Sequence, residues 1–79
     1  MKMKVYLTYN VENIRLPIIW QLGQSFAIIT NIRTADVKEN MGLVALELDG
    51  AVDVVEEAIR WLESQQVHVE PIEQNMVEG

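Results

Sequence analysis

The stretch FAIITNIRTADVKENMGLVALEL, residues 26–48, decides the fold. Residues 26–37 are rich in β-branched side chains that alternate in character, which is typical of a strand buried on one face. Residues 38–42 contain an Asn and a Gly, the residue types that supply the backbone conformations of a hairpin turn. Apolar side chains then alternate again over residues 43–48. The stretch therefore predicts two antiparallel strands joined by a tight turn.

One strand and one helix are predicted before this hairpin. Residues 3–9 alternate apolar with polar or amphipathic side chains, as expected of a half-buried strand. Pro17 then stands where a helix begins, because the fixed φ and the missing N–H of proline are harmless at the first helical position. A short helix is expected over residues 18–22, with Gly23 available to end it.

A longer helix and a short strand are predicted after the hairpin. Residues 51–66 form the clearest helical pattern of the chain, and acidic side chains occupy its polar side. The apolar positions that recur at helical spacing are Val52, Val55, Ile59 and Leu62. Trp61 lies with Val54 and Ala58 at the edge of this apolar arc. Residues 67–70 alternate once more and give a fourth strand before Pro71.

The element order is therefore βαββαβ. Two right-handed β-α-β crossovers around a central hairpin make an α+β, ferredoxin-like sandwich, in which two helices cover one face of a four-stranded antiparallel sheet. The expected strand order is 4-1-3-2. Residues 1–73 are expected to form this single domain and residues 74–79 a flexible tail.

The composition narrows the possible functions. A chain of 79 residues has room for one small core, and it contains no cysteine and one histidine. Disulfides, thiolate zinc sites and iron-sulfur clusters are thereby excluded, and we expect no metal or other cofactor. Self-association is the remaining way to add buried area. The sequence also lacks the glycine-rich phosphate loops and nucleophile motifs of enzymes, so no catalytic activity is expected.

The charge and hydropathy of the chain bear on its partners and location. A net charge of −6 disfavours nucleic acid as a partner, because phosphate backbones attract basic proteins. No segment approaches the roughly 20 apolar residues of a membrane span, and the N-terminus lacks the apolar run of a signal peptide. We therefore expect a cytoplasmic protein without membrane insertion.

The sheet face that the helices leave open should carry a mixture of apolar and polar side chains, which suits a partner or a small polar ligand. These open-face residues are Lys4, Tyr6, Thr8, Asn31, Arg33, Ala35, Leu43, Ala45, Glu47, His68 and Glu70. The alternative is a solvated face on which Arg33 pairs with Glu47, and Lys4 with Glu70, across neighbouring strands. One histidine beside one acid makes a poor transition-metal site.

The chain resembles the NIL domain between about Pro17 and Ile72. The residues that carry the resemblance are Asn31-Ile32, Ala35, Val37, Gly42, Glu47-Leu48, Gly50, Ala58-Ile59, Leu62 and Val67-His68-Val69-Glu70. The resemblance implies a ferredoxin-like fold, and a role at the C-terminus of methionine-transporter ATPases or beside iron-sulfur ferredoxin domains, or as a small separate protein. It also implies dimers that bind methionine as a regulatory signal. Arg33 stands where this family usually has Leu. ACT domains, which share the topology and a regulatory amino-acid role, are the nearest alternative.

Two functions of different classes follow from this resemblance and from the open face. The first is a non-catalytic regulatory domain that binds an amino-acid-like ligand through Asn31 and Arg33, whose amide and guanidinium suit ammonium and carboxylate groups. Asn31 has the alternative role of satisfying a backbone group at the sheet edge. The second function is a protein-interaction module that docks through Trp61 or the open face onto a transporter ATPase or a ferredoxin. In either case residues 26–37, an edge strand without proline, should pair with a second copy to form a homodimer.

Overall fold

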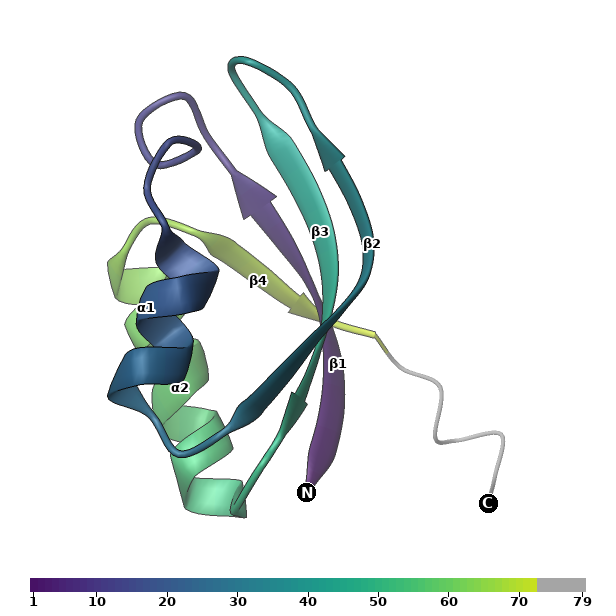
Figure 1. Cartoon of the computed structure of the whole chain (residues 1–79), viewed down its shortest axis with the longest axis vertical. Coiled ribbons are helices and arrows are strands. Elements are labelled where there is room, and N and C mark those ends of the chain that lie inside the picture. The colour runs from purple at the N-terminus through teal and green to yellow at the C-terminus, as the bar shows by residue number, and fades with distance from the viewer. Residues whose placement is uncertain (73–79) are drawn as a thin grey trace.

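The structure, a computed structural model, describes residues 1–72 and contains one antiparallel sheet with two helices on one of its faces (Figure 1). The elements are β1 (Lys2–Tyr9), α1 (Ile18–Ser25), β2 (Ile29–Val37), β3 (Gly42–Asp49), α2 (Val52–Ser64) and β4 (His68–Pro71). The strand order is β2-β3-β1-β4, which confirms the predicted order and the ferredoxin-like α+β fold. The expected tail, residues 74–79, lies outside the described residues.

The two central strands, β1 and β3, form the sheet side of the hydrophobic core. Val5 pairs with Leu46 and Leu7 with Val44, and all four side chains are buried. The intervening side chains of both strands, such as Tyr6 and its partner Ala45, lie on the open face. The alternation read from the sequence therefore assigns both faces of these strands correctly.

Helix α2 covers the core with a slightly different face from the one predicted. Val55, Ala58 and Leu62 are fully buried, whereas Val52 in the first turn is about half exposed. Ala58 was expected at the edge of the apolar arc, but it lies at the centre.

Helix α1 begins at Ile18 as predicted, but Gly23 does not end it. The helix continues to Ser25, and the backbone N–H of Phe26 closes its last turn by donating to the carbonyl of Leu22 at 3.1 Å. Phe26 was predicted to start a strand. It packs instead edge-on against the half-buried Trp61, with ring centroids 6.2 Å apart, so β2 starts at Ile29.

The loop between β1 and α1 is tied to the far end of α2 by one buried side chain, Asn13. Its side-chain oxygen accepts a hydrogen bond from the backbone N–H of Asn10 at 2.8 Å. Its amide nitrogen donates to the carbonyls of Gln65 and Gln66 at 3.1 and 3.0 Å. Gln66 has a φ of 67°, a left-handed conformation that turns the chain towards β4. Asn13 therefore holds the start of α1 against the end of α2.

Strand β2 lies at an edge of the sheet and contains a bulge. Ile32 pairs with Leu46, and the next paired residue, Thr34, is opposite Ala45, so Arg33 is the extra residue. Beyond the bulge, Ala35 pairs with Val44 and shares its helix-facing side. The prediction that Ala35 faces the open side was therefore wrong, because one inserted residue reverses the alternation that follows it.

Candidate ligand-binding site

The open face of the sheet contains a pocket of about 230 Å³, here called the open-face pocket. Strand β3 forms its floor with Ala45, whose partners are Tyr6 on β1 and Thr34 on β2. Because Ala45 is small, the longer side chains of the neighbouring strands stand around a hollow. The residues that line the pocket are Lys4, Tyr6, Arg33, Thr34, Ala45, Leu46 and Ile72.

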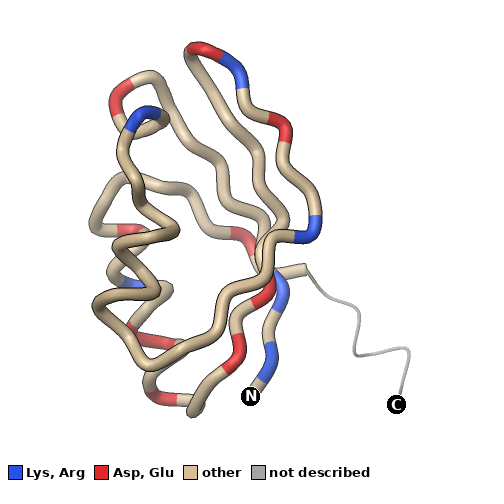
Figure 2. Tube along the Cα trace, in the orientation of Figure 1, with Lys and Arg blue, Asp and Glu red and all other residues tan. Residues whose placement is uncertain are grey.

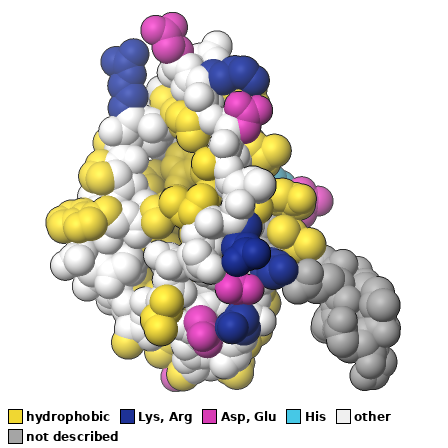
Figure 3. All heavy atoms as spheres, turned by 45° about the vertical axis from the view of Figure 1, so that its right-hand side comes forward, with side chains coloured by type: hydrophobic (Ala, Val, Ile, Leu, Met, Phe, Trp, Pro, Cys, Tyr) yellow, Lys and Arg dark blue, Asp and Glu magenta, His cyan; other side chains and the backbone are white. Residues whose placement is uncertain are grey.

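Two cationic side chains, Lys4 and Arg33, reach this pocket from strands on opposite sides of β3. Figure 2 shows the Lys and Arg positions of β1 and β2 on the sheet side of the molecule, away from the acidic positions of α2. In the space-filling view, basic side chains gather near the middle of the visible face, with acidic ones beside them (Figure 3). The pocket thus offers positive charge on a chain of net charge −6.

The ion pairs expected for these two cations, Arg33 with Glu47 and Lys4 with Glu70, do not form in the described part of the chain. The only ion pair within residues 1–72 joins Lys38 to Asp36, at 3.6 Å. Strand register is part of the reason, because Tyr6 rather than Lys4 lies opposite Glu70. Arg33 sits in the bulge and has no directly opposed partner on β3.

The second predicted site residue, Asn31, is exposed at the edge of the same face. It pairs with Glu47, two residues before the bulged Arg33, and it does not line the pocket itself. The structure therefore places Asn31 beside a pocket that Arg33 helps to form. Lys4, Tyr6 and Ala45 were assigned to the open face, but alternation alone did not indicate that a hollow forms between them.

Residues 1–72 lack two further features, a metal-binding cluster and a membrane-spanning helix. No group of three or more His, Cys, Asp or Glu side chains there is arranged to hold a metal ion. Neither helix in this range is long and apolar enough to cross a membrane.

A comparison with models of protein families identifies the family of this chain. The model of the NIL domain matches residues 4–71, almost the whole described range. The chain belongs to the NIL domain family. The match includes β1, which lies outside the stretch on which the resemblance was first based, and it covers both Asn31 and Arg33.

One solved structure that is similar to this NIL domain is part of a transporter component. The chain is similar to the crystal structure of the C-terminal domain of an ABC transporter ATP-binding protein from Enterococcus faecalis. The TM-score is 0.78 and the sequence identity 26%, over 89% of this chain and 82% of the other. A comparison with curated proteins found no match.

Proposed function

We propose that this NIL domain is a non-catalytic regulatory domain that binds a small amino-acid-like ligand as a homodimer. The observation that supports this most directly is the open-face pocket, in which Lys4 and Arg33 meet without forming an ion pair with any described residue. Two cations at the rim of a small hollow favour a ligand that carries a carboxylate.

The side chains around the pocket match the parts of an amino acid. The guanidinium of Arg33 can bind a carboxylate through two parallel hydrogen bonds, and Lys4 adds a second positive charge. Asn31 and Glu47, which pair at the edge of the pocket, supply acceptor oxygens for the ligand's ammonium group. Tyr6 and Ile72 offer apolar surface to the ligand's side chain.

Methionine is the first candidate ligand, and its support is the family relationship. Arg33 occupies a position where the family usually has Leu, and it lines the pocket. A guanidinium in place of an aliphatic side chain disfavours a thioether and favours a ligand with an acidic side chain. The two candidate ligands are therefore methionine, with its thioether away from Arg33, and an acidic amino acid whose side chain contacts Arg33.

The dimer is proposed to form through β2. Every side chain of this edge strand except Thr30 is exposed, and the exposed fractions of Ile29 and Val37 are 69% and 60%. Pairing β2 with its copy across a two-fold axis would extend the sheet to eight strands and satisfy the free backbone groups of the edge. We expect a light-scattering mass near twice the 9.0 kDa of the chain at micromolar concentration. A mass near 9.0 kDa would contradict the dimer.

Calorimetric titration of the purified chain with methionine, glutamate and alanine tests the ligand. We expect saturable heat and a higher melting temperature with one of the first two, because a bound ligand stabilises the native state by mass action. Asn31→Ala should weaken that binding, and Arg33→Leu should shift the preference from glutamate towards methionine. The matched control is Lys38→Leu, which removes a cation that is not part of the pocket. Equal binding by the wild type and Arg33→Leu would contradict the assignment of Arg33.

A second candidate function is docking onto a transporter ATPase without a metabolite. Its support is the similarity to a C-terminal domain of a transporter ATP-binding protein, together with Trp20, whose side chain is 65% exposed on α1. Trp61 was the residue first considered for docking, but it is half-buried against Phe26. The absence of heat with every amino acid at millimolar concentration would favour this function over ligand binding.

A further inference from the structure

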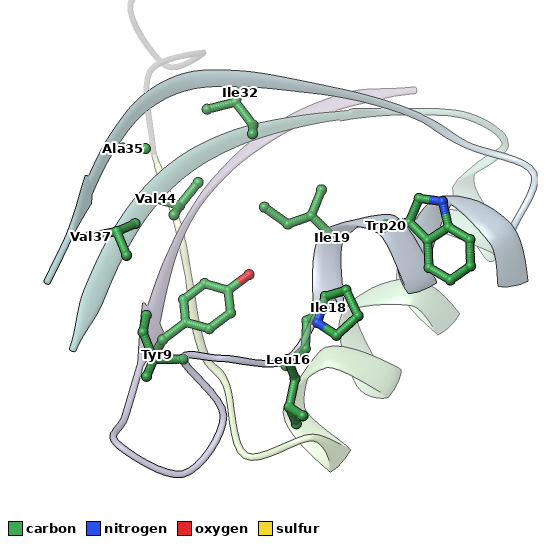
Figure 4. Close-up of a pocket in the computed structure, with 11 residues that line it drawn as sticks. Tyr9, Leu16, Ile18, Ile19, Trp20, Ile32, Ala35, Val37 and Val44 are labelled. Carbon is green, nitrogen blue, oxygen red and sulfur yellow. The ribbon is translucent and has the colours of Figure 1, made fainter. Parts of the chain in front are cut away.

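A second cavity, of about 250 Å³, lies on the other side of β2, between this strand and α1. We call it the helix-side groove. Among the residues that line it are Tyr9, Ile18, Ile19, Ile32, Ala35 and Val37, and none of its lining side chains is charged. Figure 3 shows a recess with hydrophobic walls on the visible face, and Figure 4 shows side chains of β2, β3 and α1 arranged around the groove. The bulge in β2 creates this lining, because it turns Ala35 and Val37 to the helix side.

Two of the lining side chains carry a polar atom, Tyr9 and Trp20, and the hydroxyl of Tyr9 enters this apolar space. The side chain of Tyr9 is only 6% exposed, and its hydroxyl points between the sheet and α1 towards Ile18 and Ile19 (Figure 4). No side chain or backbone group in residues 1–72 forms a hydrogen bond with it. The hydroxyl is not sealed inside the protein, because no completely buried side-chain nitrogen or oxygen in residues 1–72 lacks a hydrogen-bond partner. It is therefore reachable from the groove and can donate to a molecule that enters it.

The ionisation state of Tyr9 agrees with a role as a donor. Burial raises the pKa of the hydroxyl to about 12, because the apolar surroundings disfavour the phenolate. At neutral pH the group therefore carries its proton and can donate one hydrogen bond.

We propose that the helix-side groove binds a small, uncharged, largely apolar molecule with a single hydrogen-bond acceptor, to which the Tyr9 hydroxyl donates. The apolar lining excludes a charged ligand, because no counter-charge is present to offset its desolvation. The size of the groove restricts the ligand to something smaller than a typical drug molecule. This site lies on the opposite face of β2 from the open-face pocket and does not depend on the function proposed for that pocket.

The eight isoleucines of the chain allow this proposal to be tested with methyl-labelled protein in solution. Four of them, Ile14, Ile18, Ile19 and Ile32, line the groove. The other four, Ile28, Ile29, Ile59 and Ile72, do not line it and serve as internal controls. Acetophenone is the probe with a carbonyl acceptor, and ethylbenzene is a probe of similar size without one. We expect both probes to shift the four groove methyl signals and to leave the other four unchanged, with acetophenone binding more tightly.

The variant Tyr9→Phe separates the hydrogen bond from the groove. It should lower the affinity for acetophenone about fivefold, the value of one ordinary hydrogen bond, and leave the affinity for ethylbenzene unchanged. Ala35→Leu, which fills the groove from β2, should abolish the shifts caused by both probes. The methyl spectrum of each variant reports whether it is folded.

Three outcomes would overturn the proposal. The first is that neither probe shifts the groove methyl signals selectively, which would show that the groove is not a ligand site. The second is that Tyr9→Phe lowers the affinity for both probes equally, or for neither. Either result would show that the hydroxyl has no role in binding. The third is a set of shifts at Ile14, Ile18 and Ile19, which lie outside the β2 edge proposed for the dimer, that follows protein concentration without any probe. That result would show that a second copy of the chain fills the groove.

Discussion

The two strands of the central hairpin differ sharply in how much they bury. Strand β3 has four side chains that are at most 8% exposed, Val44, Ala45, Leu46 and Leu48. Strand β2 contributes no buried side chain, although it is one residue longer than β3. The two helices differ little in this respect, since α2 has three buried residues in 13 and α1 two in eight.

The core residues divide the molecule into an inner part, β1, β3 and α2, and an outer part, β2 and α1, which supplies Ile18 and Leu22 alone to the core of the described residues. The inner part contains most of the core and therefore most of the hydrophobic stabilisation. The outer part borders both cavities and carries exposed apolar side chains, including Trp20 and Ile29. Residues that contribute little to stability are thus available for binding.

The largest expected effect is a difference between Leu46 and Ile29, one residue from each strand of the hairpin. Leu46 is fully buried, so Leu46→Ala should lower the free energy of unfolding by about 2 to 5 kcal/mol. Ile29 is 69% exposed, so Ile29→Ala should change it by less than about 0.5 kcal/mol in the monomer. Urea denaturation at low protein concentration measures both. Similar losses in the two variants would contradict the division into inner and outer parts.

A second, smaller difference in stability is expected between variants of two asparagines, Asn13 and Asn31. Asn13→Ala removes hydrogen bonds to the carbonyls of Gln65 and Gln66 from a buried site, and should cost about 1 to 3 kcal/mol. Asn31 is exposed on the edge strand, so Asn31→Ala should leave the melting temperature almost unchanged while weakening ligand binding. Thermal denaturation distinguishes the two variants. A marked loss of stability in Asn31→Ala would favour its alternative role at the sheet edge.

Tyr9 lies where the two parts meet, and its ionisation should make the stability of the folded chain depend on pH in the alkaline range. Burial raises the pKa of its hydroxyl to about 12 in the folded chain, from 10.0 for an exposed tyrosine. The unfolded chain therefore loses this proton first, and stability present below pH 10 should decrease as the pH rises from 10 towards 12. Tyr9→Phe lacks this contribution, so its stability should fall less steeply over that interval. Parallel curves for the two proteins would contradict the raised pKa.

The smallest expected effect is an increase in stability within the outer part. Gly23 lies inside α1, and no atom is within 4 Å of the position that a Cβ would take. Gly23→Ala should stabilise the chain by about 0.5 to 1 kcal/mol, because alanine has a higher helix propensity and loses less backbone freedom on folding. Denaturation with urea measures the gain. Gly50→Ala is the contrasting variant and should destabilise, since its Cβ would lie 2.9 Å from Ile28 and 3.2 Å from the carbonyl oxygen of Ala27.

Periodicity predicted the inner part of the molecule well and the outer part incompletely. The alternation in β1 and β3 and the helical spacing in α2 follow from burial, which is what such patterns record. Strand β2 is exposed on both sides, so its pattern did not reveal where it begins or that Arg33 is bulged. The end of α1 was missed for a related reason, since Gly23 lies on an open side of the helix where nothing forces it to stop.

The sequence indicated part of the candidate site. Arg33 and Asn31 were recognised from their residue types and from the family resemblance, and both lie on the open face. The hollow over Ala45 forms because Tyr6 on β1 and Thr34 on β2 are its neighbours in the sheet. These neighbours are known only once the register of the three strands is known. The helix-side groove was not predicted, because it combines Tyr9, α1 and the part of β2 that follows the bulge. The bulge moves the side chains of that part to the opposite face of the sheet.

The position of β1 in the sheet has a consequence for the synthesis of the chain. Within this domain it is the first strand to be synthesised, yet it lies between β3 and β4, the last two strands of the domain. Its backbone therefore cannot be fully paired until residues 68–71 have emerged. The hairpin of β2 and β3 can form earlier, since its strands are adjacent in the sequence. Completion of the fold thus depends on its shortest strand, the four residues of β4.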